Sequence, residues 1–216
     1  MKDVKTIIFD WDGTLHESIE VYYDAFLKAY AFVLNKGLVE PKVYHKQEVC
    51  RFLGINPKVM WESIIPHIDE ETFIEVSSII SSEMKKRIEE GHAKLYEGTR
   101  DVLSYLKSKG YRLIYLSNSK IYYMEAMRKA FQLDDYFDQF YVSEAFNYLP
   151  KEEILRKVMP SLQKPLVMIG DRYIDILTAQ SNGIKSIGCL YGYGEKEELS
   201  DADMFIDKIT DLMNIF

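Results

Sequence analysis

Two patterns of hydrophobic and polar positions alternate along the 216-residue chain. Short apolar runs predict buried strands, here at residues 6–9, 113–116, 140–142, 166–169 and 186–190. Apolar residues at three- and four-residue spacing predict amphipathic helices, here at residues 101–109, 121–131, 151–159 and 173–182. This alternation predicts an α/β fold with a parallel sheet, right-handed crossovers and helices on both faces.

A helical segment interrupts that alternation after the first strand. Tyr22, Phe26 and Tyr30 fall on one face of a first helix, and residues 69–90 form a second amphipathic stretch. We expect the aromatic stripe to form the core of this segment rather than a binding site. The expected domains are a discontinuous core of residues 1–16 and 92–216, and an inserted helical domain of residues 17–91.

Three of the predicted strands stop abruptly at small polar or acidic residues. These clusters are residues 10–14, 117–120 and 170–172. In an open parallel sheet the ligand crevice lies outside the carboxyl ends of the strands. We therefore expect the three clusters to meet in one place.

The acidic residues of these clusters suggest a metal site. Asp10 and Asp12 lie two residues apart at a strand end, so their side chains point roughly the same way. Two neighbouring carboxylates repel each other and need a cation or a shared proton. Adding Asp171 gives a set of oxygen ligands that suits Mg²⁺. Taken alone, Asp12 and Gly13 are equally well explained as a turn, but the preceding strand and Asp171 favour the site.

At this point the sequence resembles the haloacid-dehalogenase-like phosphatases. Residues 9–15, Phe-Asp-Trp-Asp-Gly-Thr-Leu, match the DxDGT signature of that family. Residues 116–118 resemble its second motif and residues 170–175 its GDxxxD motif, while residues 184–199 are similar to the phosphoglycolate-phosphatase-like branch. The resemblance implies a Rossmann-like, doubly wound parallel sheet with an inserted α-helical cap.

The resemblance also implies the chemistry of the site. Asp10 would be the nucleophile that forms an aspartyl-phosphate, and Asp12 would act as general acid and base. Mg²⁺ would be held by Asp10, the backbone carbonyl of Asp12, and Asp171. The implied function is Mg²⁺-dependent hydrolysis of small-molecule phosphate monoesters. A phosphomutase or other phosphotransferase, and a catalytically silent phosphate-binding scaffold, remain as alternatives.

Further positions are assigned to phosphate binding by the same resemblance. Ser117 and Asn118 would bind the phosphoryl group, and capping of the following helix by Ser117, Asn118 and Ser119 is compatible with that role. Lys151 would balance the phosphate charge, but Pro150 precedes it where relatives commonly have proline after the lysine. As an isolated lysine, Lys151 is also compatible with a solvated surface. Asp175 would support the metal or the lysine, or lie solvated on its helix.

Two arginines and the histidines complete the candidates. Arg51 resembles a cap-loop arginine that would bind a substrate carboxylate or second phosphate, and an exposed surface position is the alternative. Arg172 would add a cation near the substrate or point outward. The four histidines, at positions 16, 45, 67 and 92, show no metal-ligand spacing and are interpreted as structural or exposed.

Composition restricts the partners and the compartment. The net charge of −7 argues against a nucleic-acid surface, which needs clustered Lys and Arg. No apolar stretch approaches the ~20 residues of a membrane helix, and the charged start does not resemble a signal peptide. Cys50 and Cys189 form no CxxC pair, which favours reduced thiols in a cytoplasm. The expected partner is a phosphorylated small molecule, and the oligomeric state is left open.

Overall fold

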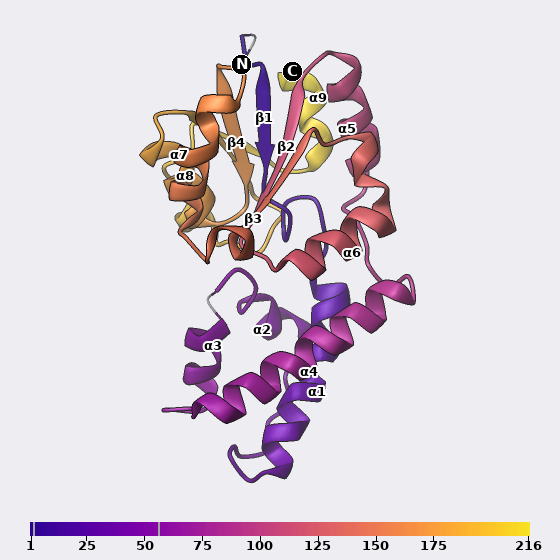
Figure 1. Cartoon of the computed structure of the whole chain (residues 1–216), viewed down its shortest axis with the longest axis vertical. Helices are drawn as coiled ribbons and strands as arrows, with labels where there is room; N and C mark the ends of the chain where they lie inside the picture. Colours follow the sequence, from indigo (N-terminus) through magenta and orange to yellow (C-terminus); the bar gives the residue numbers. More distant parts are fainter. Residues whose placement is uncertain (2, 56) are drawn as a thin grey trace. The chain divides into compact units, whose positions relative to one another are not determined.

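The computed structural model describes residues 1, 3–55 and 57–216 and divides the chain into two compact units (Figure 1). The α/β unit comprises Met1–Glu17 and Leu95–Phe216, and the inserted unit comprises Ser18–Lys94. The predicted insert, residues 17–91, begins one residue earlier and ends three residues earlier than this second unit.

The α/β unit contains a six-stranded sheet in which every neighbouring pair is parallel. The strands are β1 (Thr6–Phe9), β2 (Arg112–Ser117), β3 (Gln139–Val142), β4 (Leu166–Gly170), β5 (Lys185–Cys189) and β6 (Met204–Ile206). Their order is β3-β2-β1-β4-β5-β6, so the chain changes direction across the sheet between β1 and β4. This confirms the α/β class, and such a reversal is where open parallel sheets bind ligands.

Helices cover both faces of this sheet, as Figure 1 shows. On one side lie α7 (Lys151–Val158) and α8 (Tyr173–Ser181), and on the other lie α5 (Thr99–Ser108), α6 (Ile121–Phe131) and α9 (Leu212–Ile215). Five short 3₁₀ turns connect the elements: η1 (Leu133–Asp135), η2 (Ser143–Phe146), η3 (Met159–Ser161), η4 (Lys196–Leu199) and η5 (Ile209–Asp211).

The central strand β1 lies in the core of this unit. Ile7, Ile8 and Phe9 are fully buried, because β1 has strands on both sides and helices over both faces. Ile154 of α7 and Ala179 of α8 belong to the same buried cluster as Ile8. The edge strand β6 was not predicted, since two of its three residues are exposed and it has no buried apolar run.

The inserted unit consists of four helices among its described residues. They are α1 (Ile19–Asn35), α2 (Lys46–Cys50), α3 (Pro57–Ile64) and α4 (Glu70–Glu89). Phe26 of α1 is fully buried and packs against Tyr30, Tyr44 and Trp61 at ring-centroid distances of 6.2, 5.0 and 6.0 Å. The predicted aromatic stripe therefore contributes to the core of this unit, as expected. Among the described residues, no helix combines the length and apolar character of a membrane crossing.

Candidate active site

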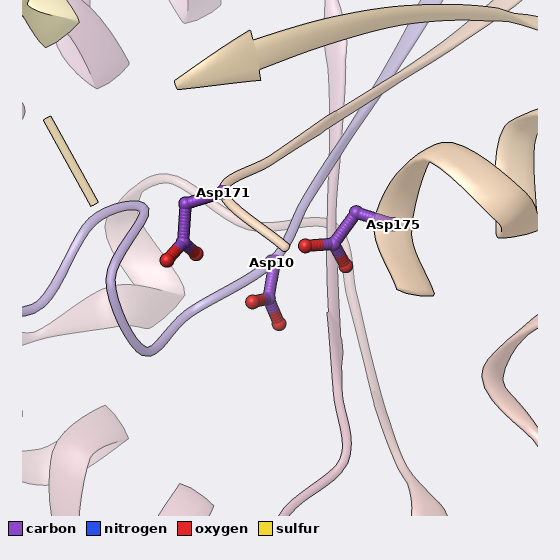
Figure 2. Close-up of side chains that lie close together, drawn as sticks. All are labelled: Asp10, Asp171 and Asp175. Atoms are coloured by element: carbon purple, nitrogen blue, oxygen red, sulfur yellow. The ribbon is translucent and has the colours of Figure 1, made fainter. Parts of the chain in front are cut away.

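Three buried carboxylates gather at the carboxyl edge of the sheet (Figure 2). Asp10 follows β1, Asp171 follows β4, and Asp175 lies in the first turn of α8. One oxygen from each lies within 4.8 Å of the other two. Parallel register produces this convergence, because the last residue of β1, Phe9, pairs with Ile169, and the backbone N–H of Asp10 donates to the carbonyl of Ile169 at 2.9 Å.

A buried lysine joins two of these carboxylates. Nζ of Lys151 donates to Oδ1 of Asp10 and to Oδ1 of Asp175, each at 2.7 Å. Only 2% of Lys151 is exposed. This burial excludes the solvated surface position that was the alternative for an isolated lysine. Burial by itself lowers the pKa of Lys151, but the two carboxylates outweigh that effect and raise the pKa above its ordinary value. Lys151 is therefore a charged group at the first position of α7, directly after Pro150.

The carboxylates retain excess negative charge despite this lysine. Burial and then repulsion by Asp175 raise the pKa of Asp10 well above its usual range, although Lys151 partly offsets them. Burial and Asp175 likewise raise the pKa of Asp171 to about 7, against lowering contributions from hydrogen bonds to Tyr193 and Thr14. With all three carboxylates ionised beside one ammonium, the cluster would carry two negative charges. An oxygen cluster with this charge fits a hard divalent cation.

The surrounding loops hold Asp171 in one orientation. Its Oδ1 accepts from Oγ1 of Thr14 at 2.9 Å, and its Oδ2 accepts from the backbone N–H of Tyr193 at 2.7 Å. Gly13 has φ of 85°, and a Cβ there would lie 2.1 Å from Oδ2 of Asp171. A Cβ at Gly192 would lie 2.2 Å from Cβ of Asp171. Only glycine allows these two loops to approach the carboxylate so closely.

Asp175 binds Lys151. The metal and this lysine were the two partners expected for it. While Oδ1 binds Lys151, Oδ2 accepts from the backbone N–H of Arg172 at 3.0 Å. Asp175 is fully buried, so the solvated alternative is excluded. The Arg172 side chain binds the carboxylate of Glu198, with Nε 3.0 Å from Oε2.

Asp12 lies on the same loop, but its carboxylate binds a different set of residues. Oδ1 of Asp12 is 2.6 Å from the Tyr123 hydroxyl and 3.3 Å from Nδ1 of His16. The sequence interpretation missed both partners. Tyr123 resembled any apolar position of a helix, and His16 was grouped with the other histidines. The one sequence signal for a contact with Asp12 was the position of His16, four residues later in the chain.

The remaining candidates differ in exposure. Ser117 is buried at the end of β2, while Asn118 is exposed. The expectation that residues 117–119 also cap α6 is wrong, because the N-cap residue is Lys120 and the backbone N–H of Ile121 donates to Glu144 at 2.7 Å. Arg51 is exposed at the end of α2 in the inserted unit. His45, His67 and His92 are exposed, as expected, whereas His16 is fully buried.

Comparison with known proteins identifies similar chains along most of the sequence. A family model described as haloacid dehalogenase-like hydrolase matches residues 7–189. Pyrophosphatase PpaX of Anoxybacillus flavithermus is 26% identical over 219 aligned residues, covering 99% of this chain and 97% of that protein.

Solved structures share the fold of the chain. A predicted phosphatase from Clostridium acetobutylicum has a TM-score of 0.81 at 28% identity, over 98% of this chain and 97% of that one. The haloacid dehalogenase-like family protein SP0104 of Streptococcus pneumoniae has a TM-score of 0.84 at 22% identity, over 100% of both chains. The second likeness is evidence of the fold alone.

Proposed function

Because the chain belongs to the haloacid dehalogenase-like hydrolase family, we propose that it is a Mg²⁺-dependent phosphatase for small-molecule phosphate monoesters. The observation that carries this proposal is the position of Asp10, which lies in a buried acidic cluster in contact with a charged lysine. The similarity to a phosphatase and to a pyrophosphatase over nearly the whole chain supports it.

The donor atoms fit a magnesium ion. The carboxylates of Asp10 and Asp171 and the backbone carbonyl of Asp12 would hold it, and their excess negative charge would be balanced by its two positive charges. A bound Mg²⁺ supplies Lewis-acid neutralisation of the phosphoryl oxygens.

In the first step a carboxylate oxygen of Asp10 attacks the substrate phosphorus. A bond forms between that oxygen and phosphorus, and the bond from phosphorus to the leaving oxygen breaks. Asp12 donates a proton to the leaving oxygen, which departs as an alcohol. Lys151, 2.7 Å from Asp10, favours the ionised form of the nucleophile and offsets phosphoryl charge. Ser117 and Asn118 would bind the phosphoryl oxygens.

In the second step the aspartyl-phosphate is hydrolysed. Asp12, now ionised, removes a proton from a water molecule that attacks phosphorus. The bond between phosphorus and the Asp10 oxygen breaks, which releases inorganic phosphate and restores both aspartates to their starting states. Asp175 acts through Lys151, because its carboxylate binds Nζ at 2.7 Å and holds the ammonium beside Asp10.

Inorganic pyrophosphate is a second candidate substrate, since a relative that matches the whole chain is named a pyrophosphatase. The same two steps would transfer one phosphoryl group to Asp10 and release phosphate as the leaving group.

The test is a panel of phosphorylated metabolites and pyrophosphate, assayed for phosphate release with Mg²⁺. We expect release from a subset of the panel by the wild type and none by Asp10→Asn, whose amide is not a competent nucleophile. Formation of a new phosphate ester in place of free phosphate would indicate a mutase. Absence of any phosphoryl transfer by the wild type, or equal release by the Asp10→Asn variant, would overturn the proposal.

A further inference from the structure

Two residues that the reaction described above does not use, Tyr123 and His16, form a compact polar triad with the carboxylate of Asp12. The Tyr123 hydroxyl lies 2.6 Å from Oδ1 of Asp12 and 3.1 Å from Nδ1 of His16. Nδ1 of His16 lies 3.3 Å from the same Oδ1. Tyr123 is 4% exposed and His16 is fully buried, whereas the Asp12 side chain is 28% exposed.

The backbone and the aromatic packing fix both partners. The backbone N–H of Gly13 donates to the carbonyl of His16 at 3.0 Å, which folds the loop back so that the imidazole faces Asp12. Trp11 stacks on the imidazole with ring centroids 5.5 Å apart and planes 13° apart. The ring of Phe131 in α6 packs beside the imidazole with ring centroids 6.1 Å apart, and Tyr123 lies in the first turn of that helix.

The geometry indicates how the hydrogen bonds of these three residues are directed. The Tyr123 hydroxyl donates to Oδ1 of Asp12, because an ionised carboxylate oxygen only accepts. Nδ1 of His16 faces that carboxylate oxygen and the tyrosine oxygen, both of which can accept. An unprotonated Nδ1 would place two acceptors 3.3 Å apart beside a fully buried imidazole, which is costly. This contact favours the tautomer with a proton on Nδ1.

We propose that Tyr123 and His16 are positioning residues that bind Oδ1 of Asp12 and leave Oδ2 to exchange the proton with the leaving group and the hydrolytic water. This inference rests on the proposed phosphatase function. When Oδ2 gives its proton to the leaving oxygen, negative charge develops on the carboxylate, and the two donors already aimed at Oδ1 stabilise it. Oδ2 regains a proton from water in the second step, and the triad hydrogens stay in place.

Removing the tyrosine hydroxyl tests the positioning role. Tyr123→Phe should lower the first-turnover rate with an alkyl phosphate about tenfold to a hundredfold, a part of the ~10²–10⁴-fold that general acid catalysis supplies. The first-turnover rate with an activated aryl phosphate should change less than about threefold, because that leaving group needs little protonation. The aspartyl-phosphate should accumulate with both substrates, since activation of water is impaired. KM should stay nearly constant.

Tyr141→Phe is the matched control in the same unit. Its hydroxyl donates to Oε1 of Gln139 at 2.7 Å, so the control also removes one hydrogen bond, but from a residue outside the proposed site. We expect no change in the ratio of the first-turnover rate with the alkyl phosphate to that with the aryl phosphate, called the alkyl-to-aryl ratio. A purely structural role for Tyr123 would lower both first-turnover rates equally, and that result would overturn the inference.

Two substitutions of His16 separate its donor from its packing. His16→Asn retains an amide donor near the position of Nδ1, whereas His16→Phe retains the aromatic ring and removes the donor. The alkyl-to-aryl ratio should fall in His16→Phe and be largely restored in His16→Asn, even where the asparagine variant melts at a lower temperature. The opposite order would show that packing, and not the hydrogen bond, is what matters.

A double-mutant cycle and a tautomer measurement complete the test. In an Asp12→Asn background, Tyr123→Phe should cause no further loss, because the tyrosine acts through that carboxylate. Nitrogen-15 NMR of histidine-labelled protein should show a slowly exchanging proton on Nδ1 of His16, identified by its loss in His16→Asn. A proton on Nε2 alone would overturn the inference even if hydrolysis is confirmed. A wild type that hydrolyses nothing but shows the Nδ1 proton would instead overturn the phosphatase function.

Discussion

The strand ends of the α/β unit and the helices of the inserted unit place charged groups in opposite environments. At the strand ends, Asp10, Asp171, Asp175 and Lys151 are all less than one tenth exposed. In the inserted unit, the ion pair between Lys28 and Glu83 has a lysine side chain that is 62% exposed. Charged side chains are thus taken out of water at the strand ends, whereas the lysine of this pair in the inserted unit stays in contact with it.

This difference separates a structural use of charge from a functional one. A solvated ion pair contributes little to folding, because water screens the attraction. Buried carboxylates oppose folding unless a cation compensates them, which is why the pKa values of Asp10 and Asp171 are raised. Proteins retain such costly arrangements mainly where the chemistry requires them. The comparison therefore points to the strand ends as the catalytic part of the chain.

The largest effect is expected from Asp10→Asn, which should remove phosphoryl transfer altogether. The amide cannot attack phosphorus, so neither turnover nor covalent labelling of the protein should remain. Intact-mass analysis during turnover would show about 80 Da added to the wild type, as for any phosphorylation, and nothing added to the variant. A phosphorylated Asp10→Asn protein would place the nucleophile elsewhere.

Removal of the metal should abolish activity reversibly. When its carboxylates are ionised, the buried cluster carries more negative charge than Lys151 balances, and without a cation this charge would repel the phosphate. Treatment with EDTA should stop phosphate release, and added Mg²⁺ should restore it. Ca²⁺ should inhibit, because its larger and looser coordination shell would misplace the nucleophile. Full turnover in metal-free buffer would refute the magnesium assignment.

Asp12→Asn should slow hydrolysis by ~10²–10⁴-fold without preventing labelling. Asp12 only moves protons, so an activated aryl phosphate should still phosphorylate Asp10, while the adduct persists because water is no longer activated. Hydroxylamine trapping would detect the adduct. If Asp12→Asn accumulates no adduct and Asp10→Asn does, the two roles are reversed.

Substituting one lysine in each unit compares the two environments directly. Lys151→Met leaves buried carboxylates without their cation and should lower the free energy of unfolding by about 3–5 kcal/mol in metal-free buffer. Lys28→Met removes an exposed partner of Glu83 and should cost no more than about 1 kcal/mol. Urea denaturation of both variants gives the comparison. Equal losses of unfolding free energy in the two variants would mean that the burial of Lys151 does not determine its contribution to stability.

The smallest effect is expected from Arg51→Ala in the inserted unit. If Arg51 binds the natural substrate, its loss should raise KM about tenfold, the value of one hydrogen bond to a charged group. Hydrolysis of a generic aryl phosphate should remain nearly unchanged. Equal losses on both substrates, with a lowered melting temperature, would indicate damage to the helices. No loss on either would leave Arg51 as a surface residue.

Much of the fold was predictable because local patterns reflect local structure. The predicted strand 6–9 coincides with β1, and the predicted helix 121–131 coincides with α6. Runs without a strong pattern were missed, as β6 shows. The convergence of Asp10 with Asp171 was also predictable, since parallel strands bring their carboxyl ends to one edge.

The sequence by itself determined which strands end in acidic residues and therefore where the carboxylates gather. Tertiary structure alone decided that Lys151 is buried between Asp10 and Asp175, and that Tyr123 and His16 bind Asp12. The physical reason is separation along the chain: Tyr123 and Asp12 lie 111 positions apart, and Lys151 and Asp10 lie 141 apart. Periodicity shows which face of an element is apolar, but contacts between distant segments depend on how those faces pack.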